Sequence, residues 1–307
     1  GDGNGYIDDI AGWDFFENDN NPFATNASNY GDHGTGVMEG AATEGGTGKI
    51  GICPNCAVLP IRVGDSFITT GPHIAQAILF AAEHRAAALA MALGGMTDSA
   101  FVRAAVEWAA ERGTVIVAAA GDETSFHRNW PAAQPGVLNV HSITASNRDD
   151  ISSASSFLRF VNCNNFGGRV DLVATSSNAC ATGAVSMIAG AVGLVQSAAV
   201  ERNGALLTPV QLVALLTTTA TDVDLPDSRG PDAVPDLYPS HPGWDAFFGW
   251  GRIHVGRAVA AITDDALPPQ AEITSPDWYS FHLQDDYTAG PAGSGVLANT
   301  PGIEVRG

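Results

Sequence analysis

Short apolar runs alternate with longer segments of helical periodicity through most of the chain. The runs have the length of buried strands and are 57–63 (AVLPIRV), 86–93 (AAALAMAL), 114–121 (TVIVAAAG), 137–144 (VLNVHSIT) and 169–174 (RVDLVA). Helical spacing predicts helices over 74–85, 101–112, 182–201 and 209–217. Strands that are apolar on both faces and alternate with helices indicate an α/β fold, in which helices cover both faces of a doubly wound, mostly parallel sheet.

Capping residues support the predicted helix starts. Pro72 suits the first turn of the first of these helices, and either Asp98 or Ser99 is expected to cap the second. Thr208 is the expected cap of the last helix, which begins at Pro209.

Composition changes after residue 221 and divides the chain. The stretch 222–245 is rich in Pro, Asp and Gly and is expected to be an irregular surface loop, whereas 247–262 restores an ordered turn and a helix. Pro268-Pro269 marks a boundary, which predicts one domain over 1–264 followed by a linker and the beginning of a β-rich second domain over 265–307. The start at Gly1 indicates that the sequence is part of a larger chain.

Charge excludes two classes of partner. The 307 residues carry 14 Lys plus Arg against 33 Asp plus Glu, a formal net charge of −19, which disfavours nucleic acid and anionic lipid. The longest apolar segment, 184–200, contains Ser and Gln and is too short for a typical bilayer span. We expect it to be a buried helix.

The four cysteines include one Cys-x-x-Cys pair, Cys53 and Cys56. Such a pair can be redox-active, half of a zinc site or a small disulfide loop, and no second pair is present to complete a zinc site. The acidic composition with low charge density suits an exported protein. We therefore predict a structural disulfide between Cys53 and Cys56, with Cys163 and Cys180 as a second pair, and a secreted or cell-surface location.

Candidate chemistry lies where the predicted strands end, because ligands of doubly wound sheets bind beyond the carboxyl ends of the strands. Gly94-Gly95, Gly121-Asp122-Glu123 and the loop 174–183 are placed there. His33 begins another apolar, helical segment within YGDHGTGV (30–37), and the glycines after it allow backbone or substrate to approach the ring. His33 is thus a candidate general base.

An ordered series of motifs resembles the subtilases, the subtilisin-like serine endopeptidases. The series includes HGTGV (33–37) as the histidine motif, MALGG (91–95) as the substrate-lining strand, VAAAGDE (117–123) as the oxyanion strand and IAGAVGLV (188–195) as the helix behind the nucleophile. The resemblance covers roughly residues 2–262. It implies a three-layer α/β sandwich, a polypeptide substrate contacted by Leu93, Gly94 and Gly95, and a bacterial source.

The resemblance also implies a degraded catalytic triad. The family order is Asp, His, Ser, and the family aspartate lies on a strand upstream of DGNGYIDD (2–9), so neither Asp2 nor Asp8 takes that role. The family serine lies eight positions before Gly190, which is Thr182 here. The β-methyl group of threonine restricts its χ1 angle and crowds the path of attack. Ser176, Ser177 and Ser186 are nearby but at the wrong offsets.

Asp122 stands where the family places the asparagine of its oxyanion hole. An ionised carboxylate would repel the developing oxyanion instead of donating a hydrogen bond. The resulting hypothesis is a pseudopeptidase with His33 at the base position. An active serine protease with a displaced nucleophile, and a peptide-binding or structural module of a secreted multidomain protein, are the alternatives.

The segment 2–9 also resembles a calcium loop, with oxygen ligands at Asp2, Asn4 and Asp8. Its sixth position is Ile7 and not Gly, and it lacks the distal Glu of an EF-hand. Many subtilases carry calcium, so we predict bound Ca²⁺ here, against the alternative of a solvated acidic turn.

Overall fold

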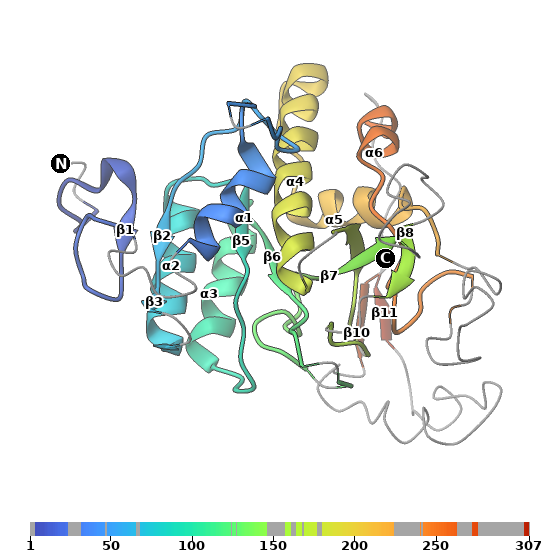
Figure 1. The fold of residues 1–307 in the computed structure, drawn as a ribbon, viewed down its shortest axis with the longest axis horizontal. Coiled ribbons are helices and arrows are strands. Elements are labelled where there is room, and N and C mark those ends of the chain that lie inside the picture. Colours follow the sequence, from blue (N-terminus) through green and yellow to red (C-terminus); the bar gives the residue numbers. More distant parts are fainter. Residues whose placement is uncertain are drawn as a thin grey trace.

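The computed structural model shows a layered α/β fold (Figure 1). It describes residues 4–23, 32–46, 48–65, 68–123, 125–126, 128–145, 157–160, 164–167, 169–176, 180–223, 240, 242–262, 272–275 and 304–306.

A five-stranded sheet forms the centre of the molecule. Its strands are β5 (Ala88–Met91), β6 (Val115–Ala119), β7 (Val137–Ala145), β8 (Phe157–Phe160) and β9 (Leu172–Thr175). β5, β6 and β7 follow one another in parallel, and β9 is also parallel to β7, whereas β8 is antiparallel to it. The predicted mostly parallel sheet is confirmed. The sequence did not predict β8, because its residues do not form a continuous apolar run.

Helices cover both faces of this sheet, as predicted. They are α2 (Gly71–Glu83) and α3 (Ala100–Glu111) on one face, and α4 (Ala181–Asn203), α5 (Pro209–Thr218) and α6 (Val255–Ala261) on the other. Successive residues of β6 alternate between the two faces: Ile116 packs with α2 and α3, and Val117 packs with α4 and α5. This alternation explains why the whole of β6 is apolar and buried.

α4 is the central helix of the second layer. It is the one helix in the described part of the chain that is long and apolar enough to cross a bilayer, with a mean hydropathy of 1.6 over an 18-residue window. Its apolar side chains instead pack against the sheet, with Val185, Ile188 and Val192 fully buried among β6, β7 and β9. The prediction of a buried helix is confirmed.

The helix caps agree in part with the sequence. Thr208 caps α5 as predicted: its Oγ1 accepts a hydrogen bond from Gln211 N at 3.3 Å, and the Gln211 side chain bonds back to Thr208 N. Ser99 is the N-cap residue of α3, but its side chain makes no capping hydrogen bond. Asp98 instead pairs with Arg103, which lies one turn into the helix.

The N-terminal part of the chain forms a second, smaller sheet. β1 (Trp13–Asp14) and β2 (Ile61–Arg62) are parallel, and the buried Asp14 forms an ion pair with Arg62. Phe80 of α2 packs against the β1–β2 pair, whereas Ile78 of α2 packs against the main sheet. α2 therefore holds the two sheets side by side.

β2 and β5 leave open edges in the described part of the chain. The carbonyl oxygen of Arg62 accepts a hydrogen bond from Phe15 N, directly after β1, and that of Ala87 accepts one from Val115 N of β6. Because successive residues of a parallel strand face opposite sides, the backbone N–H and C=O groups of Ile61, Ala88 and Ala90 point away from those partners. β5 was expected to be buried, but Ala90 is exposed. These edges are typical of interior strands that lack one neighbour.

The apolar side chains of α1 (His33–Ala42) are also incompletely covered by other parts of the described structure. Its apolar residues Val37 and Met38 are only partly buried, and none of its residues is fully buried. Beyond α6, β10 (Glu272–Ser275) and β11 (Glu304–Arg306) pair antiparallel, and both lie in the segment that the sequence predicted to be β-rich. A short hairpin of β3 (Gly64–Asp65) and β4 (Ile68–Thr69) follows β2.

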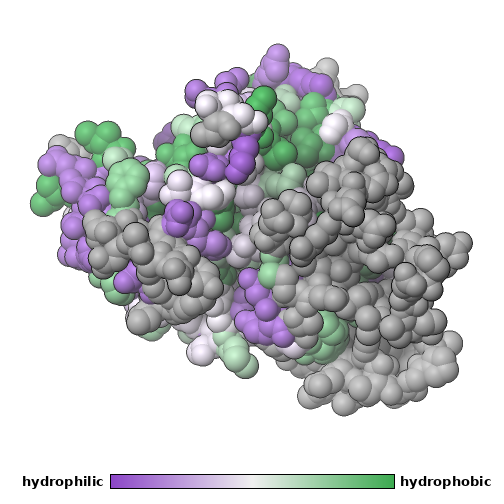
Figure 2. Space-filling model, in the orientation of Figure 1, coloured by the Kyte–Doolittle hydropathy of each residue, from purple (hydrophilic) through white to green (hydrophobic). Residues whose placement is uncertain are grey.

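The described surface mixes polar and apolar residues (Figure 2). At the end of the molecule formed by the N-terminal segment, hydrophobic residues lie among hydrophilic ones. Ile10, in the short 3-10 helix Asp9–Ala11, is 95% exposed, and Ile7 and Phe23 are also exposed.

Candidate active site

His33 is the first residue of α1, where the sequence placed it. The side chain is exposed, and in the part of the chain that the structure describes its ring makes no hydrogen bond. The preceding Asp32 gives no side-chain cap to the helix. The imidazole therefore stands exposed at the start of α1.

α1 docks on α4 through small residues. A Cβ at Gly190 of α4 would lie 2.8 Å from the carbonyl oxygen of Ala41, and a Cβ at Gly40 of α1 would lie 2.5 Å from Ser186 Oγ. Both distances are shorter than side chains tolerate, so the glycines permit the helices to approach closely.

Thr182 is the second residue of α4 and is partly buried. Ser186 lies one turn later, is only 6% exposed and donates from Oγ to Gly183 O at 3.0 Å. It packs against Gly40, which lies about 10 Å along the α1 axis from His33 at 1.5 Å per residue. Ser186 is thus too distant and too enclosed to be the displaced nucleophile. Ser177 lies outside the described residues.

Asp122 follows β6 and reaches the start of α4. Its Oδ1 accepts a hydrogen bond from Ala181 N at 3.0 Å. Partial burial raises the pKa of the Asp122 carboxyl and the Glu123 carboxylate adds to the rise, whereas the Ala181 N–H and the nearby His33 act in the opposite direction. The structure therefore brings Asp122 and His33 together at the N-terminus of the helix that carries Thr182.

Asn165 holds the loop that carries Asp122. Its Oδ1 accepts hydrogen bonds from Glu123 N at 3.1 Å and Ser125 N at 3.2 Å, and its Nδ2 donates to Ala120 O at 3.2 Å. Gly121 has a φ of 109°, and a Cβ there would lie 2.2 Å from Asn165 Nδ2. Sequence reasoning missed Asn165, because it lies 42 residues from Glu123 and belongs to none of the recognised motifs.

The predicted substrate strand continues from β5. Gly95 exchanges two backbone hydrogen bonds with Trp130, at 2.9 Å and 2.7 Å. A Cβ at Gly94 would lie 1.9 Å from Asn129 Nδ2, so this position has no room for a side chain. Since Gly95 faces Trp130, the backbone of Gly94 faces the opposite, exposed side.

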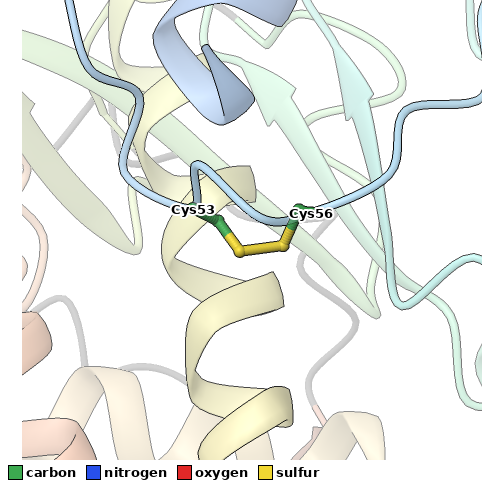
Figure 3. The surroundings of a disulfide bond; sticks show 2 residues. All are labelled: Cys53 and Cys56. Carbon is green, nitrogen blue, oxygen red and sulfur yellow. A yellow bond between two sulfur atoms is a disulfide. The ribbon is translucent and has the colours of Figure 1, made fainter. Parts of the chain in front are cut away.

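The cysteines support the disulfide prediction. Cys53 and Cys56 are bonded, and the pair lies beside α4 (Figure 3). Cys180, directly before α4, is also in a disulfide. Cys163, its predicted partner, lies outside the described residues.

In the predicted calcium loop, the side chain of Asn4 bonds to neighbouring residues of the same segment. Asn4 Oδ1 accepts from Tyr6 N at 2.9 Å, and Asn4 Nδ2 donates to Asp9 Oδ2 at 2.7 Å. No cluster of three or more His, Cys, Asp or Glu side chains suited to a metal occurs among the described residues. Asp2 lies outside them, so calcium binding involving Asp2, Asn4 and Asp8 stays a prediction.

Comparison with known proteins gives the same family as the motifs. Residues 3–251 match the model of the subtilase family. Thermitase from Thermoactinomyces vulgaris is 32% identical over 169 residues, which are 55% of this chain and 56% of that protein. A halolysin-like extracellular serine protease, Nep, from Natrialba magadii is 31% identical over 54% of this chain and 29% of its own length. The aligned part spans about half or less of each relative.

Solved structures share the fold. A lanthipeptide protease matches with a TM-score of 0.62 and 16% identity, over 82% of this chain and 80% of that one. A mutant of the protease domain of PatA matches with a TM-score of 0.59 and 21% identity, over 76% of this chain and 80% of its own. With the family match spanning most of the sequence, the chain belongs to the subtilase family.

Proposed function

We propose that this chain is the subtilisin-like peptidase domain of a secreted protein that binds extended polypeptide and hydrolyses amide bonds poorly or not at all. The proposal rests mainly on Thr182, the second residue of α4, which the motif offset from Gly190 aligns with the nucleophilic serine of the family. Losing the nucleophile of such a triad lowers kcat by about six orders of magnitude, a value measured in subtilisin itself. A threonine retains a hydroxyl, but its methyl group hinders the attack.

Asp122 supports the loss of turnover independently. Its carboxylate accepts the Ala181 N–H at the end of α4 toward which the oxyanion of a bound peptide would be directed. The site thus has an acceptor in place of a donor, and that acceptor also occupies a backbone N–H. Removing one oxyanion donor costs roughly two to three orders of magnitude in kcat, again from subtilisin.

Peptide binding is supported by the exposed edge at Gly94. An extended polypeptide adds to such an edge through backbone hydrogen bonds, which do not require the catalytic groups. Leu93, Gly94 and Gly95 would provide this edge, and the hydrogen bonds between Gly95 and Trp130 keep it extended. Binding can therefore persist although hydrolysis is lost.

The open edges of β2 and β5 bear on the third triad member. The family places its aspartate on a strand N-terminal to residue 2, and we propose that this strand pairs with both edges in the full-length protein. It would cover the partly buried residues of α1 and bring the carboxylate toward His33. An aspartate there would orient the imidazole but would not replace the missing serine.

Secretion is supported by the Cys53–Cys56 disulfide and by the second disulfide at Cys180, since disulfides persist in oxidising compartments. The relative Nep is described as extracellular, which agrees with this location.

The decisive experiment treats the full-length protein with a fluorophosphonate probe and a fluorescent unfolded protein. We expect binding of the unfolded protein, no covalent labelling and no cleavage. The double variant Thr182→Ser with Asp122→Asn should gain labelling, because it restores the alcohol and a donor. Labelling of the parent protein that Thr182→Val removes, with Ser186→Ala as a matched control, would overturn the proposal.

A further inference from the structure

We propose that the Cys53–Cys56 disulfide is a redox-sensitive latch, whose reduction by a dithiol loosens α1 from α4 and displaces His33 from the site. The loosening of α1 from α4 does not depend on the proposed function. The effect of that loosening on peptide binding rests on the proposed function.

The disulfide segment holds the C-terminal end of α1. Cys53 N donates to Ala41 O at 2.8 Å, and Ile52 N donates to Gly40 O at 3.2 Å. Gly51 N donates to Thr43 O at 2.8 Å, directly after the helix. These carbonyls have no partner within the helix, so the residues before the disulfide cap the end of α1.

The sulfur atoms lie directly against the backbone of α4 (Figure 3). A Cβ at Gly193 would lie 2.7 Å from Cys56 Sγ and 3.6 Å from Cys53 Sγ. One turn earlier, a Cβ at Gly190 would lie 2.9 Å from Ile52 Cβ. The 51–56 segment and α1 therefore occupy one face of α4, and the covalent S–S bond lets both cysteines fit over Gly193.

Reduction would remove this fit. Two electrons and two protons from the dithiol convert the S–S bond into two S–H groups, and the dithiol becomes a disulfide. Two thiol sulfurs repel at distances well beyond a covalent bond, so they need more space than Gly193 leaves. Cys56 is partly exposed beside the exposed Asn55, which gives the reductant access, whereas Cys53 is buried.

Hydrogen exchange tests the latch directly on the full-length protein. After treatment with dithiothreitol, we expect alkylation of Cys53 and Cys56. The amides of Ile52 and Cys53 should then exchange at least about tenfold faster, with the amides of β6 unchanged. Resistance of this disulfide to the dithiol in the folded protein, or unchanged exchange of both amides after reduction, would overturn the proposal.

A double-mutant cycle supplies a second measurement. Gly193→Ala should lower Tm strongly in the disulfide-bonded protein and much less in a Cys53→Ala/Cys56→Ala background. Gly256→Ala in α6 is the control, since its Cβ would meet only His254, at 3.5 Å. Equal effects of Gly193→Ala in both backgrounds would count against the latch. Loosening of α1 in a protein that never binds unfolded polypeptide would refute the proposed function and leave the latch intact.

Discussion

The Asp122 carboxylate accepts the backbone N–H of Ala181 at 3.0 Å, so this side chain is bonded to the first residue of α4, the helix that carries Thr182. An anion at a helix N-terminus is stabilised by the free N–H groups and the helix dipole. The hydrogen bond between Asp122 and Ala181 therefore stabilises the start of α4. The same carboxylate disfavours a second negative charge, such as an oxyanion, beside it.

The pH dependence of Asp122→Asn tests this environment. Burial and Glu123 raise the pKa of Asp122 in the folded state, so the folded protein holds this proton to higher pH than the unfolded chain does. Stability should thus fall as pH rises above the ordinary Asp range, and Asp122→Asn should remove that part of the fall. Urea unfolding of both proteins from about pH 4 to 7 measures the difference. Identical pH profiles would contradict the raised pKa.

His141 should have the opposite influence on stability. Complete burial lowers the pKa of this imidazole to about 4, although its ring nitrogens face the carbonyl oxygens of Ser142 and Phe247. Between pH 6.5 and 4 the unfolded chain binds a proton that the folded protein does not, so stability falls as pH falls. A shift of this size corresponds to roughly 3 kcal/mol. Comparison of unfolding with that of His141→Gln isolates the effect, and parallel profiles would refute it.

The close approach of α1 and α4 predicts a cost for Gly190→Ala. The new Cβ would lie 2.8 Å from Ala41 O and 2.9 Å from Ile52 Cβ, so one of the two elements must shift. We expect a loss of about 1–3 kcal/mol in the free energy of unfolding. Gly34→Ala in α1, with no atom within 4 Å of its Cβ, is the control. Equal effects of the two substitutions in chemical denaturation would exclude tight docking at Gly190.

The open edges predict a specific pattern of amide exchange. In a chain that begins at residue 1, the amides of Ile61, Ala88 and Ala90 should exchange fast, because their N–H groups face away from β1 and β6. The amide of Leu89, which faces β6, should be protected and provides the internal control. A chain extended by the proposed aspartate strand should protect all four. Fast exchange of Ala88 and Ala90 in the extended chain would contradict the placement of that strand.

Motif spacing predicted where two candidate site residues stand in the secondary structure. His33 begins α1, and Thr182, chosen by its offset from Gly190, lies at the start of α4. The contacts of the candidate site residues in space could not be predicted from the sequence. Ser186 lies close to Thr182 in sequence but at the wrong offset from Gly190, and its burial against Gly40 is a second, structural argument against it.

The sequence by itself determined four of the five strands of the main sheet and the helices α2 to α5, since apolar periodicity and capping residues such as Thr208 act within a few positions of the chain. It also determined the parallel order of the sheet, because continuous apolar runs such as Val115–Ala119 require cover on both faces. Only the tertiary structure decided that Asp122 bonds to Ala181, that Asn165 holds the loop beside it, and that β5 keeps an open edge. These contacts join residues far apart in the chain, and their energies depend on packing and burial that no local pattern encodes.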